Sequence, residues 1–441
     1  MPLIEIERRG GLPRWFGVFS KRNHCAWLDG VDGARGADWS ILAADPVECR
    51  SGPEEDLLAW LDEWEARLKT VATAEIPFLG GLIGQLDYEE AMPPYPSEGI
   101  PRLSGWMGLY DRALAEHRPS GRMFAVVGEW VEGAEEELRS WVDQLKDLPE
   151  KTPAPRAIRS SKPISNQTRA EYVGGVRRVR EWIASGDIYQ ANLSQRFRCE
   201  TEVQPEDLYR SLRKENPAPY SAYIDCGVKQ ILSSSPELFL EVGADRSVST
   251  RPIKGTRPRS AEPKKDREMA SDLQKNAKER AELLMIVDME RNDLGRVCRT
   301  GSVRAEKEFA LESFASVHHL VGGVRGELRP EVRMSDLFAA TFPGGSITGA
   351  PKSRAMEIIR ELEPERRGAY CGTMGFLSAG GVSRWNIAIR TMEVLGNRVE
   401  FGVGAGIVWD SDPEAEFEET LHKAQKILSS LGWPEEQEEP R

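Results

Sequence analysis

The chain has 441 residues, 40% of them hydrophobic and 29% charged, which is enough for a sizeable core and, at about 150 residues each, for two or three domains. The formal net charge of −12 argues against non-specific binding of nucleic acid, which needs clustered positive charge. No apolar run approaches the ~18 residues of a membrane span, and the first residues lack the basic and then apolar order of a secretory signal. We therefore expect a protein that binds neither nucleic acid nor a membrane.

The six cysteines lie far apart, with no C-x-x-C pair. This favours reduced thiols in a cytoplasmic protein over a disulfide framework or a zinc site. The only close histidines, His318 and His319, are adjacent and therefore point in different directions on a helix or a strand. Any metal must then be held by carboxylates, which suggests a hard cation such as Mg²⁺.

The N-terminal part, residues 1–148, mixes helical and strand-like patterns. Apolar residues recur at helical spacing over 57–68 and again over 138–145, with strand-like runs around 79–84 and 124–127 between them. These patterns predict two helices with strands between them.

Residues 149–166 are rich in Pro, Ser and basic residues, which predicts an extended linker. A larger C-terminal part follows over 167–431, and the polar, acidic residues 432–441 are predicted to form a frayed tail.

The C-terminal part opens with a well-marked helix, for which Thr168 is the predicted N-cap, Glu171 its capping-box partner and Gly186 the end. The next segment, 188–197, alternates like a strand. One face of this predicted strand carries Tyr189, Ala191, Leu193 and Phe197.

Three further helices are predicted. A charged one opens within 256–281 and becomes apolar at 283–287, a second starts near Ser353 after the glycine-rich stretch 343–352, and the last runs from Asp412-Pro413 to about Leu431. Strands and helices mixed without regular βαβ alternation predict an α+β fold.

Lys254 is a candidate nucleophile. It precedes a glycine in a basic segment, and the neighbouring Arg251 and Arg257 could lower the pKa of its amine. A neutral amine is a nucleophile, whereas an ammonium is not. The residues alone equally allow a solvated lysine in a basic turn.

Four glutamates are candidates for acid chemistry or metal binding: Glu237, Glu282, Glu416 and Glu419. Glu416 and Glu419 are three residues apart on the predicted last helix, about 60° apart around its axis, so both can face one point. With a carboxylate from another helix they would suit Mg²⁺. The alternative is an exposed acidic helix start, which the helix dipole favours.

Two glycine-rich stretches, 344–349 and 402–408, could bring backbone close to a ligand. The first lacks the G-K-[ST] ending of a phosphate loop, and the G-x-G-x-G spacing of the second is not a dinucleotide fingerprint. The first stretch is therefore interpreted either as a loop whose backbone amides hold a carboxylate or as a plain turn.

Ten ordered segments within about residues 165–431 resemble the chorismate-utilising enzymes, and DWSILAADP and LGGLIGQLDY resemble more loosely the leading domain of anthranilate and aminodeoxychorismate synthases. The ten segments are GDIYQANLSQRF, SSSPELFL, RPIKGTRPR, ERAELLMIVDMERNDLGRV, SVHHLVGGV, TFPGGSITGAPKSRAMEII, RRGAYCGTMGF, IAIRT, GVGAGIV and EAEFEETLHKAQKIL. The resemblance implies an anthranilate-synthase-like fold, with a β-sandwich core of two large antiparallel sheets flanked by helices.

A few positions indicate the branch of the family. Anthranilate synthases usually have alanine where this chain has Lys254, and lysine there is typical of the aminodeoxychorismate synthases of the folate and p-aminobenzoate pathway. Isochorismate and salicylate synthases carry a basic lysine where this chain has Gln190, which favours ammonia over water as the nucleophile. The stretch Ser40–Ala44 also lacks the L-L-E-S run associated with tryptophan feedback, although a structural tryptophan site stays open.

The resemblance also implies roles for single residues. Glu282 and Glu419, helped by Glu416, would bind Mg²⁺, which would grip the ring carboxylate of chorismate. Glu237 would protonate the departing 4-hydroxyl while Lys254 attacks C2, and ammonia would then add at C4 and displace the lysine. The other expected site residues are Tyr370, Arg390 and the amides of Gly404, Ala405 and Gly406 around the enolpyruvyl carboxylate, Thr348 and Gln190 in the pocket, and His319 as a catalytic residue near the ring.

No cysteine lies in a G-x-C-x-G nucleophile elbow, so ammonia from glutamine would need a separate amidotransferase subunit. The expected product is 4-amino-4-deoxychorismate. The alternatives are an anthranilate synthase component I, a non-catalytic chorismate-binding subunit, an isochorismate-type hydrolytic enzyme and, least favoured, a pyridoxal-phosphate enzyme built on Lys254.

Overall fold

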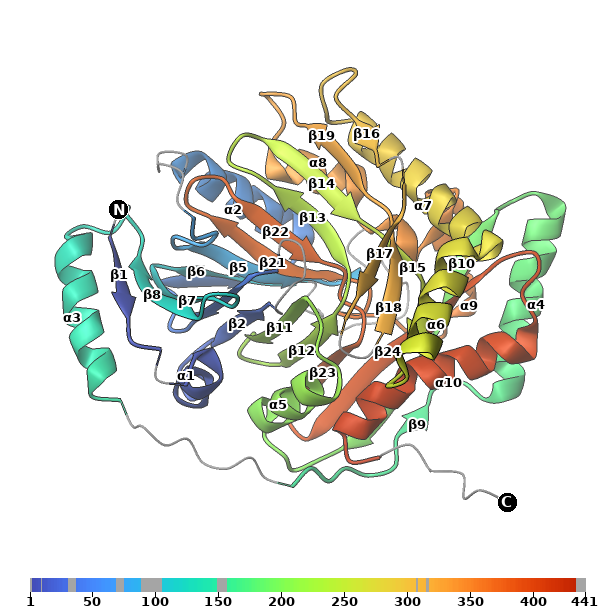
Figure 1. The fold of residues 1–441 in the computed structure, drawn as a ribbon, viewed down its shortest axis with the longest axis horizontal. Helices are drawn as coiled ribbons and strands as arrows, with labels where there is room; N and C mark the ends of the chain where they lie inside the picture. Colours follow the sequence, from blue (N-terminus) through green and yellow to red (C-terminus); the bar gives the residue numbers. More distant parts are fainter. Residues whose placement is uncertain are drawn as a thin grey trace.

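The computed structural model describes residues 2–8, 10–30, 37–68, 75–88, 105–148, 157–306, 308–314 and 317–433. Within them, two large β-sheets face each other and helices cover both outer faces (Figure 1). Every strand pairing between the described strands is antiparallel. The predicted α+β class, with a sandwich of two antiparallel sheets flanked by helices, is confirmed.

The first sheet contains, in spatial order, β1 (Leu3–Ile6), β8 (Arg122–Val127), β7 (Arg112–His117), β3 (Trp39–Ala43), β2 (Ala26–Asp29), β11 (Tyr220–Asp225), β12 (Gln230–Ser235), β23 (Thr391–Leu395), β24 (Arg398–Ile407), β10 (Gln190–Glu200) and β20 (Gly349–Ala350), with β9 (Ile164–Ser165) also on β10. The second contains β16 (Arg304–Ala305), β19 (Val324–Glu327), β14 (Ser247–Arg251), β13 (Leu238–Val242), β22 (Ser383–Asn386), β21 (Thr373–Ser378), β5 (Gly81–Leu86), β6 (Gly105–Tyr110) and β4 (Glu48–Ser51). A small third sheet has the order β15 (Ile253–Pro258), β18 (Val317–Val321), β17 (Ala310–Ser313).

Apolar side chains from both sheets fill the space between them, such as Ile41 and Ala222 from the first and Ile83 and Phe376 from the second. Helices bury their apolar stripes against the outer faces. The first sheet is covered by α1 (Leu12–Phe19), α3 (Ala134–Lys146), α5 (Pro205–Glu215) and α10 (Pro413–Ser430), with α4 (Arg169–Ser185) and α9 (Lys352–Leu362) against its β10 end. The second is covered by α2 (Glu54–Arg67), α7 (Ala277–Gly295) and α8 (Met334–Thr341), while α6 (Pro263–Lys275) packs on the third sheet.

Strands of the N-terminal part are interleaved with those of the C-terminal part. In the first sheet β2 pairs with β11, and in the second sheet β5 pairs with β21. Of the predicted linker, residues 149–156 lie outside the described residues, whereas 157–166 contain β9. Residues 434–441 of the predicted tail also lie outside them. The boundaries between the N-terminal part, the linker, the C-terminal part and the tail therefore remain predictions.

Most of the predicted elements are present, and the caps of α4 are as expected. The Thr168 side chain accepts a hydrogen bond from the Glu171 amide in a capping box, and Gly186 ends the helix in the left-handed conformation. One prediction is wrong, because the single helix expected from 256–281 onward is two helices that meet at Asn276, whose side chain caps α7. Tyr189 lies just before β10 and is 71% exposed.

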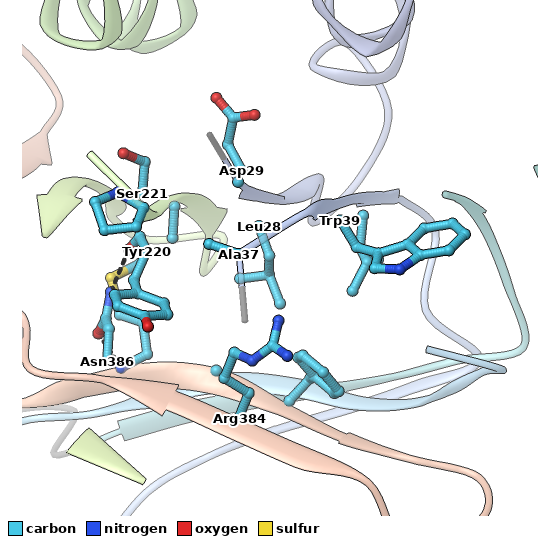
Figure 2. Close-up of a pocket in the computed structure, with 15 residues that line it drawn as sticks. Leu28, Asp29, Ala37, Trp39, Tyr220, Ser221, Arg384 and Asn386 are labelled. Carbon is cyan, nitrogen blue, oxygen red and sulfur yellow. Dashed lines mark hydrogen bonds between the residues drawn. The ribbon is translucent and has the colours of Figure 1, made fainter. Parts of the chain in front are cut away.

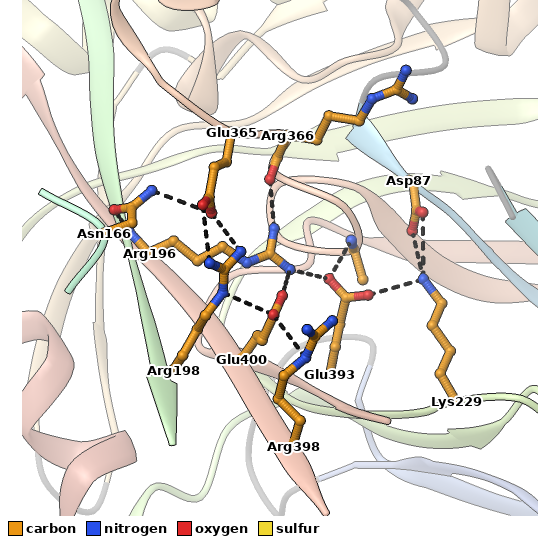
Figure 3. A network of polar contacts seen from close by, with 11 residues as sticks. Asp87, Asn166, Arg196, Arg198, Lys229, Glu365, Arg366, Glu393, Arg398 and Glu400 are labelled. Carbon is orange, nitrogen blue, oxygen red and sulfur yellow. Dashed lines mark hydrogen bonds and ion pairs between the residues drawn. The ribbon is translucent and has the colours of Figure 1, made fainter. Parts of the chain in front are cut away.

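An ion-pair network fixes the strands that lead to the candidate site (Figure 3). Arg196 on β10 bridges Glu393 on β23 and Glu400 on β24, and Lys229 binds both Glu393 and Asp87. The pKa of Glu393 is lowered to about 2 because Lys229 and Arg196 outweigh its burial. These ionic contacts link the side chains of the neighbouring strands β10, β24 and β23.

A separate, narrow cavity of about 40 Å³ lies between the sheets, where β2 and β11 face β21 and β22 (Figure 2). Its charged lining is already paired, since Asp29 binds Arg213 and Arg384 binds Glu241 at 3.0 Å. None of the predicted site residues lines this cavity. Among the described helices, none combines the length and the apolar character that crossing a membrane requires.

Candidate active site

The candidate site lies at one end of the long β10–β24 pair. The register places Asn192 opposite Gly406, Leu193 opposite Ala405 and Ser194 opposite Gly404. A Cβ atom added at Gly406 would lie 2.6 Å from Nε2 of Gln190 and 3.3 Å from Nζ of Lys254. Glycine at this position therefore lets an amide and an amine from different strands meet against the backbone of β24.

Lys254 reaches this point from β15 of the third sheet. The register of β15 with β18 shifts between Lys254 and Thr256, at Gly255, whose φ of +75° is left-handed. A bulge re-aims the side chain beside it, and glycine adopts this backbone without strain. The bulge at Gly255 thus directs the Lys254 amine toward Gly406 of β24.

Burial lowers the pKa of Lys254, and the ammonium of Lys423 lowers it further, although Glu282 and Glu237 oppose them. Part of the predicted cause is wrong. Arg251 is paired with Glu312, and Arg257 is paired with Asp272 at 2.9 Å and with Glu279 at 3.5 Å. Desolvation and a different lysine, rather than the flanking arginines, favour the neutral amine.

Glu237 lies in the buried turn between β12 and β13 and is 3% exposed. The Ile387 amide donates to its backbone oxygen at 3.0 Å, and the Ile253 amide lies 3.4 Å from its carboxylate. Burial raises the pKa of Glu237 to about 7, with Lys254 and Arg390 close enough to limit the rise. This carboxyl can therefore carry a proton near neutral pH.

The three candidate metal ligands come from two helices, Glu282 from α7 and Glu416 and Glu419 from α10. Burial raises the pKa of Glu282 and of Glu416, and the Glu419 carboxylate adds to both shifts. The three carboxylates therefore face a common region. Two of these carboxylates have lysine ammonium groups as ionic partners. Glu419 binds Lys423 at 2.7 Å, and Glu282 lies 4.0 Å from Lys278.

No set of three or more His, Cys, Asp or Glu side chains within the described ranges is close enough to hold a metal ion as it stands. The donor chemistry nevertheless fits Mg²⁺, which takes carboxylate oxygens and keeps several waters. Carboxylates that raise one another's pKa gain from a shared cation.

Arg390 lies close enough to both His319 and Glu237 to affect their charges. Burial lowers the pKa of Arg390 to about 10, and Glu237 opposes this shift. Burial, and next the nearby Arg390 charge, lower the pKa of His319 to about 3. His319 is thus a neutral imidazole at neutral pH, with Nδ1 3.0 Å from the Thr256 hydroxyl. It can donate or accept a hydrogen bond there but cannot act as a cationic acid.

Tyr370 and Thr348 complete the predicted set. The Tyr370 ring packs against Gly402, and its hydroxyl lies 3.2 Å from the point that a Cβ atom at Gly404 would occupy. Thr348 is buried, with its hydroxyl donating to Gly344 at 3.0 Å and its carbonyl accepting from Asn192 on β10 at 2.8 Å. Its side chain therefore closes the glycine-rich loop, and its backbone carbonyl joins the loop to β10.

A family model described as chorismate binding enzyme matches residues 23–429. The chain belongs to the chorismate binding enzymes. It is 36% identical to aminodeoxychorismate synthase component 1 of Escherichia coli (strain K12) over 94% of this chain and 95% of that protein. It is also 39% identical to anthranilate synthase component 1 of Streptomyces coelicolor, over 80% of this chain and 73% of that one.

Among solved structures, the chain resembles anthranilate synthase component I from Streptococcus pneumoniae TIGR4, with a TM-score of 0.78 and 32% identity. The match covers 90% of this chain and 93% of that one. The anthranilate-synthase-like fold and the resemblance to chorismate-utilising enzymes are therefore confirmed.

Sequence reasoning overlooked two residues of this chorismate binding enzyme that contact the predicted set. The Lys423 amine donates to the Gly404 carbonyl at 3.0 Å as well as binding Glu419. The Asn216 side chain accepts a hydrogen bond from Arg390 at 3.2 Å. For Lys423 a signal was available, since it follows Glu419 by four residues on one helix face. For Asn216 there was none, because its partner is far away in the sequence.

Proposed function

We propose that this enzyme aminates chorismate at C4 to give 4-amino-4-deoxychorismate, as component I of an aminodeoxychorismate synthase. The ammonia would come from a separate glutamine amidotransferase subunit. The observation that carries the proposal is the Lys254 amine, whose pKa is lowered and which meets Gln190 and Gly406 at the end of β24.

The first step forms a bond from Lys254 Nζ to C2 of chorismate. Both ring double bonds shift, from C1=C2 and C5=C6 to C1=C6 and C4=C5, and the C4–O bond breaks. Hydroxide is a poor leaving group, so a proton from Glu237 lets it depart as water. With a pKa of about 7, Glu237 is partly protonated at neutral pH and can supply that proton.

In the second step ammonia forms a bond to C4, both ring double bonds shift back to C1=C2 and C5=C6, and the C2–N bond to Lys254 breaks. Glu237, now a carboxylate, can take the proton that the new amine releases. The covalent adduct replaces one difficult substitution with two easier ones. Gln190 suits ammonia as the incoming nucleophile because an amide cannot remove a proton from water.

Arg390 and the amides of Gly404, Ala405 and Gly406 would hold the enolpyruvyl carboxylate, with Tyr370 beside them. Glu282, Glu416 and Glu419 would hold Mg²⁺. When bound, Mg²⁺ would neutralise the ring carboxylate and withdraw electron density from the ring.

An anthranilate synthase component I is the second candidate, because relatives with that name match at similar identity. That chemistry adds ammonia directly at C2, with no use for an amine at the position of Lys254. A non-catalytic subunit is less well supported, because Lys254, Glu237 and the three carboxylates all lie around one region.

The test is incubation of the purified protein with chorismate, Mg²⁺ and ammonium, followed by product identification by mass and fluorescence. We expect 4-amino-4-deoxychorismate, which differs from anthranilate in mass because it retains the enolpyruvyl group. Fluorescent anthranilate as the main product would refute the proposal in favour of the second candidate. Intact chorismate would favour the non-catalytic alternative.

A further inference from the structure

Arg390 binds a neutral side chain from the end of a distant helix. Its Nη1 donates to Oδ1 of Asn216 at 3.2 Å, and Asn216, directly after α5, is 3% exposed. We infer that Asn216 is a positioning residue, which orients the Arg390 guanidinium toward a substrate carboxylate and leaves its charge available. The inference rests on the proposed function only in taking chorismate as the source of that carboxylate.

The backbones of the two residues are held by one strand. The Ser234 amide on β12 donates to the Arg390 carbonyl at 3.0 Å, and the Ser234 hydroxyl donates to the Asn216 carbonyl. The Asn216 amide in turn donates to Leu212 of α5 at 2.9 Å. Arg390 has a φ of 51°, which is uncommon for a residue other than glycine and needs such support. The side-chain hydrogen bond therefore joins two fixed points.

The choice of an amide has an electrostatic consequence. Another buried arginine, Arg367, binds the Glu363 carboxylate at 2.7 Å, so its charge is neutralised within the protein. At Arg390 the amide accepts a hydrogen bond and fixes the guanidinium plane but adds no negative charge. Glu237 is the acid that does act on the Arg390 charge, and it carries no charge in its protonated form. An anionic ligand can then gain the attraction of a desolvated cation.

A second observation concerns the nitrogen of the Asn216 side-chain amide. The Asn216 Nδ2 atom is buried and has no hydrogen-bond partner among the described residues. An unpaired buried donor is costly, so it is usually satisfied by a ligand or a water. A carboxylate bound by Arg390 is an anionic acceptor of the kind that such a donor can serve.

Two substitutions separate this role from a merely structural one. Asn216→Asp keeps the shape and can accept the same hydrogen bond, but it places a carboxylate against Arg390. We expect this variant to melt no lower than wild type and to bind chorismate at least about ten-fold more weakly. Asn216→Ala leaves the guanidinium unoriented, and we expect a similar rise in KM for chorismate, with kcat and the KM for ammonium changed less than about two-fold.

The control is Asn166→Ala, which removes an asparagine that accepts a hydrogen bond from the Arg196 amide at 2.8 Å. It should lose stability without a change in the Kd for chorismate. Calorimetric Kd values of chorismate for all four proteins are the readout, because they do not depend on which product forms. A wild type that binds chorismate and releases anthranilate would refute the proposed function and leave this comparison valid. Asn216→Asp and Asn216→Ala proteins that bind chorismate as tightly as wild type would overturn the inference. If one of them fails to fold, the Kd of the other decides.

Discussion

Glu237→Gln should remove the proton that lets the 4-hydroxyl leave. The change keeps the size of the buried side chain, and we expect kcat/KM for chorismate to fall by about 10²- to 10⁴-fold, the usual contribution of a general acid. A pKa of about 7 in the free enzyme also sets a pH dependence. Since the protonated form is the active one, the active fraction falls from about one half at pH 7 to about one tenth at pH 8.

The wild-type profile of kcat/KM for chorismate should therefore decline above about pH 7, and that descending limb should vanish in Glu237→Gln. The assay follows chorismate consumption from pH 6 to 9, with the concentration of free NH₃ saturating at every pH so that the ammonium equilibrium does not shape the curve. Glu241→Gln is the control, because Glu241 lies on β13 but binds Arg384 at 3.0 Å. It should keep the wild-type profile. A descending limb that survives in Glu237→Gln would refute the acid role.

Four further predictions concern other parts of the molecule. Lys254→Ala should lose most 4-amino-4-deoxychorismate formation and still bind chorismate by calorimetry, because the amine acts in the chemical step; a wild-type rate would mean that Lys254 has no catalytic role. Turnover should stop in excess EDTA and return with Mg²⁺, and Glu419→Gln should raise the Mg²⁺ concentration for half-activity by at least ~10-fold, the loss seen even for outer partners of metal ligands. Ammonium alone should support turnover, whereas glutamine should do so only after an amidotransferase subunit is added; glutamine-driven turnover by this chain would contradict the need for that subunit. Glu393→Gln should cost about 1–3 kcal/mol of unfolding free energy at pH 7, because Lys229 and Arg196 lose the carboxylate that they share, while each keeps a second partner in Asp87 and Glu400. The folded pKa of Glu393 lies at about 2, below the unfolded value, so the difference from wild type should shrink as pH falls from about 4 to about 2, as measured by denaturant titration.

Local signals in the sequence predicted the local structure well. Thr168 and Glu171 form the expected capping box, and Asp412 caps α10 through the amides of Glu414 and Ala415. Caps depend on residues within one turn, so a short stretch of sequence contains all the required information.

Features that depend on distant partners could not be predicted. The polar face of β10, which includes Gln190, Asn192 and Ser194, is buried because other layers cover it, although a period of two predicts a solvated face. The arginines beside Lys254 bind acids from other segments, so they do not determine the pKa of its amine. Asn216 and Arg390 are 174 residues apart in the sequence, and only the pairing of β12 with β23 brings them together.

The candidate site itself was recognised from resemblance rather than from periodicity. The fold brings Lys254, Gln190 and Gly406 to one point, and the helices bring Glu282 and Glu419 within mutual electrostatic influence. The roles of these residues remain predictions, which the substitutions above test.

The most direct test of the central claim is a search for the covalent intermediate. Wild-type protein given chorismate and Mg²⁺ without ammonia should accumulate an adduct, which mass spectrometry after proteolysis would locate on the peptide that contains Lys254. The adduct should be absent from Lys254→Ala and should disappear from wild type when ammonium is added, as product is released. An active enzyme that forms no adduct on that peptide under these conditions would contradict the lysine route.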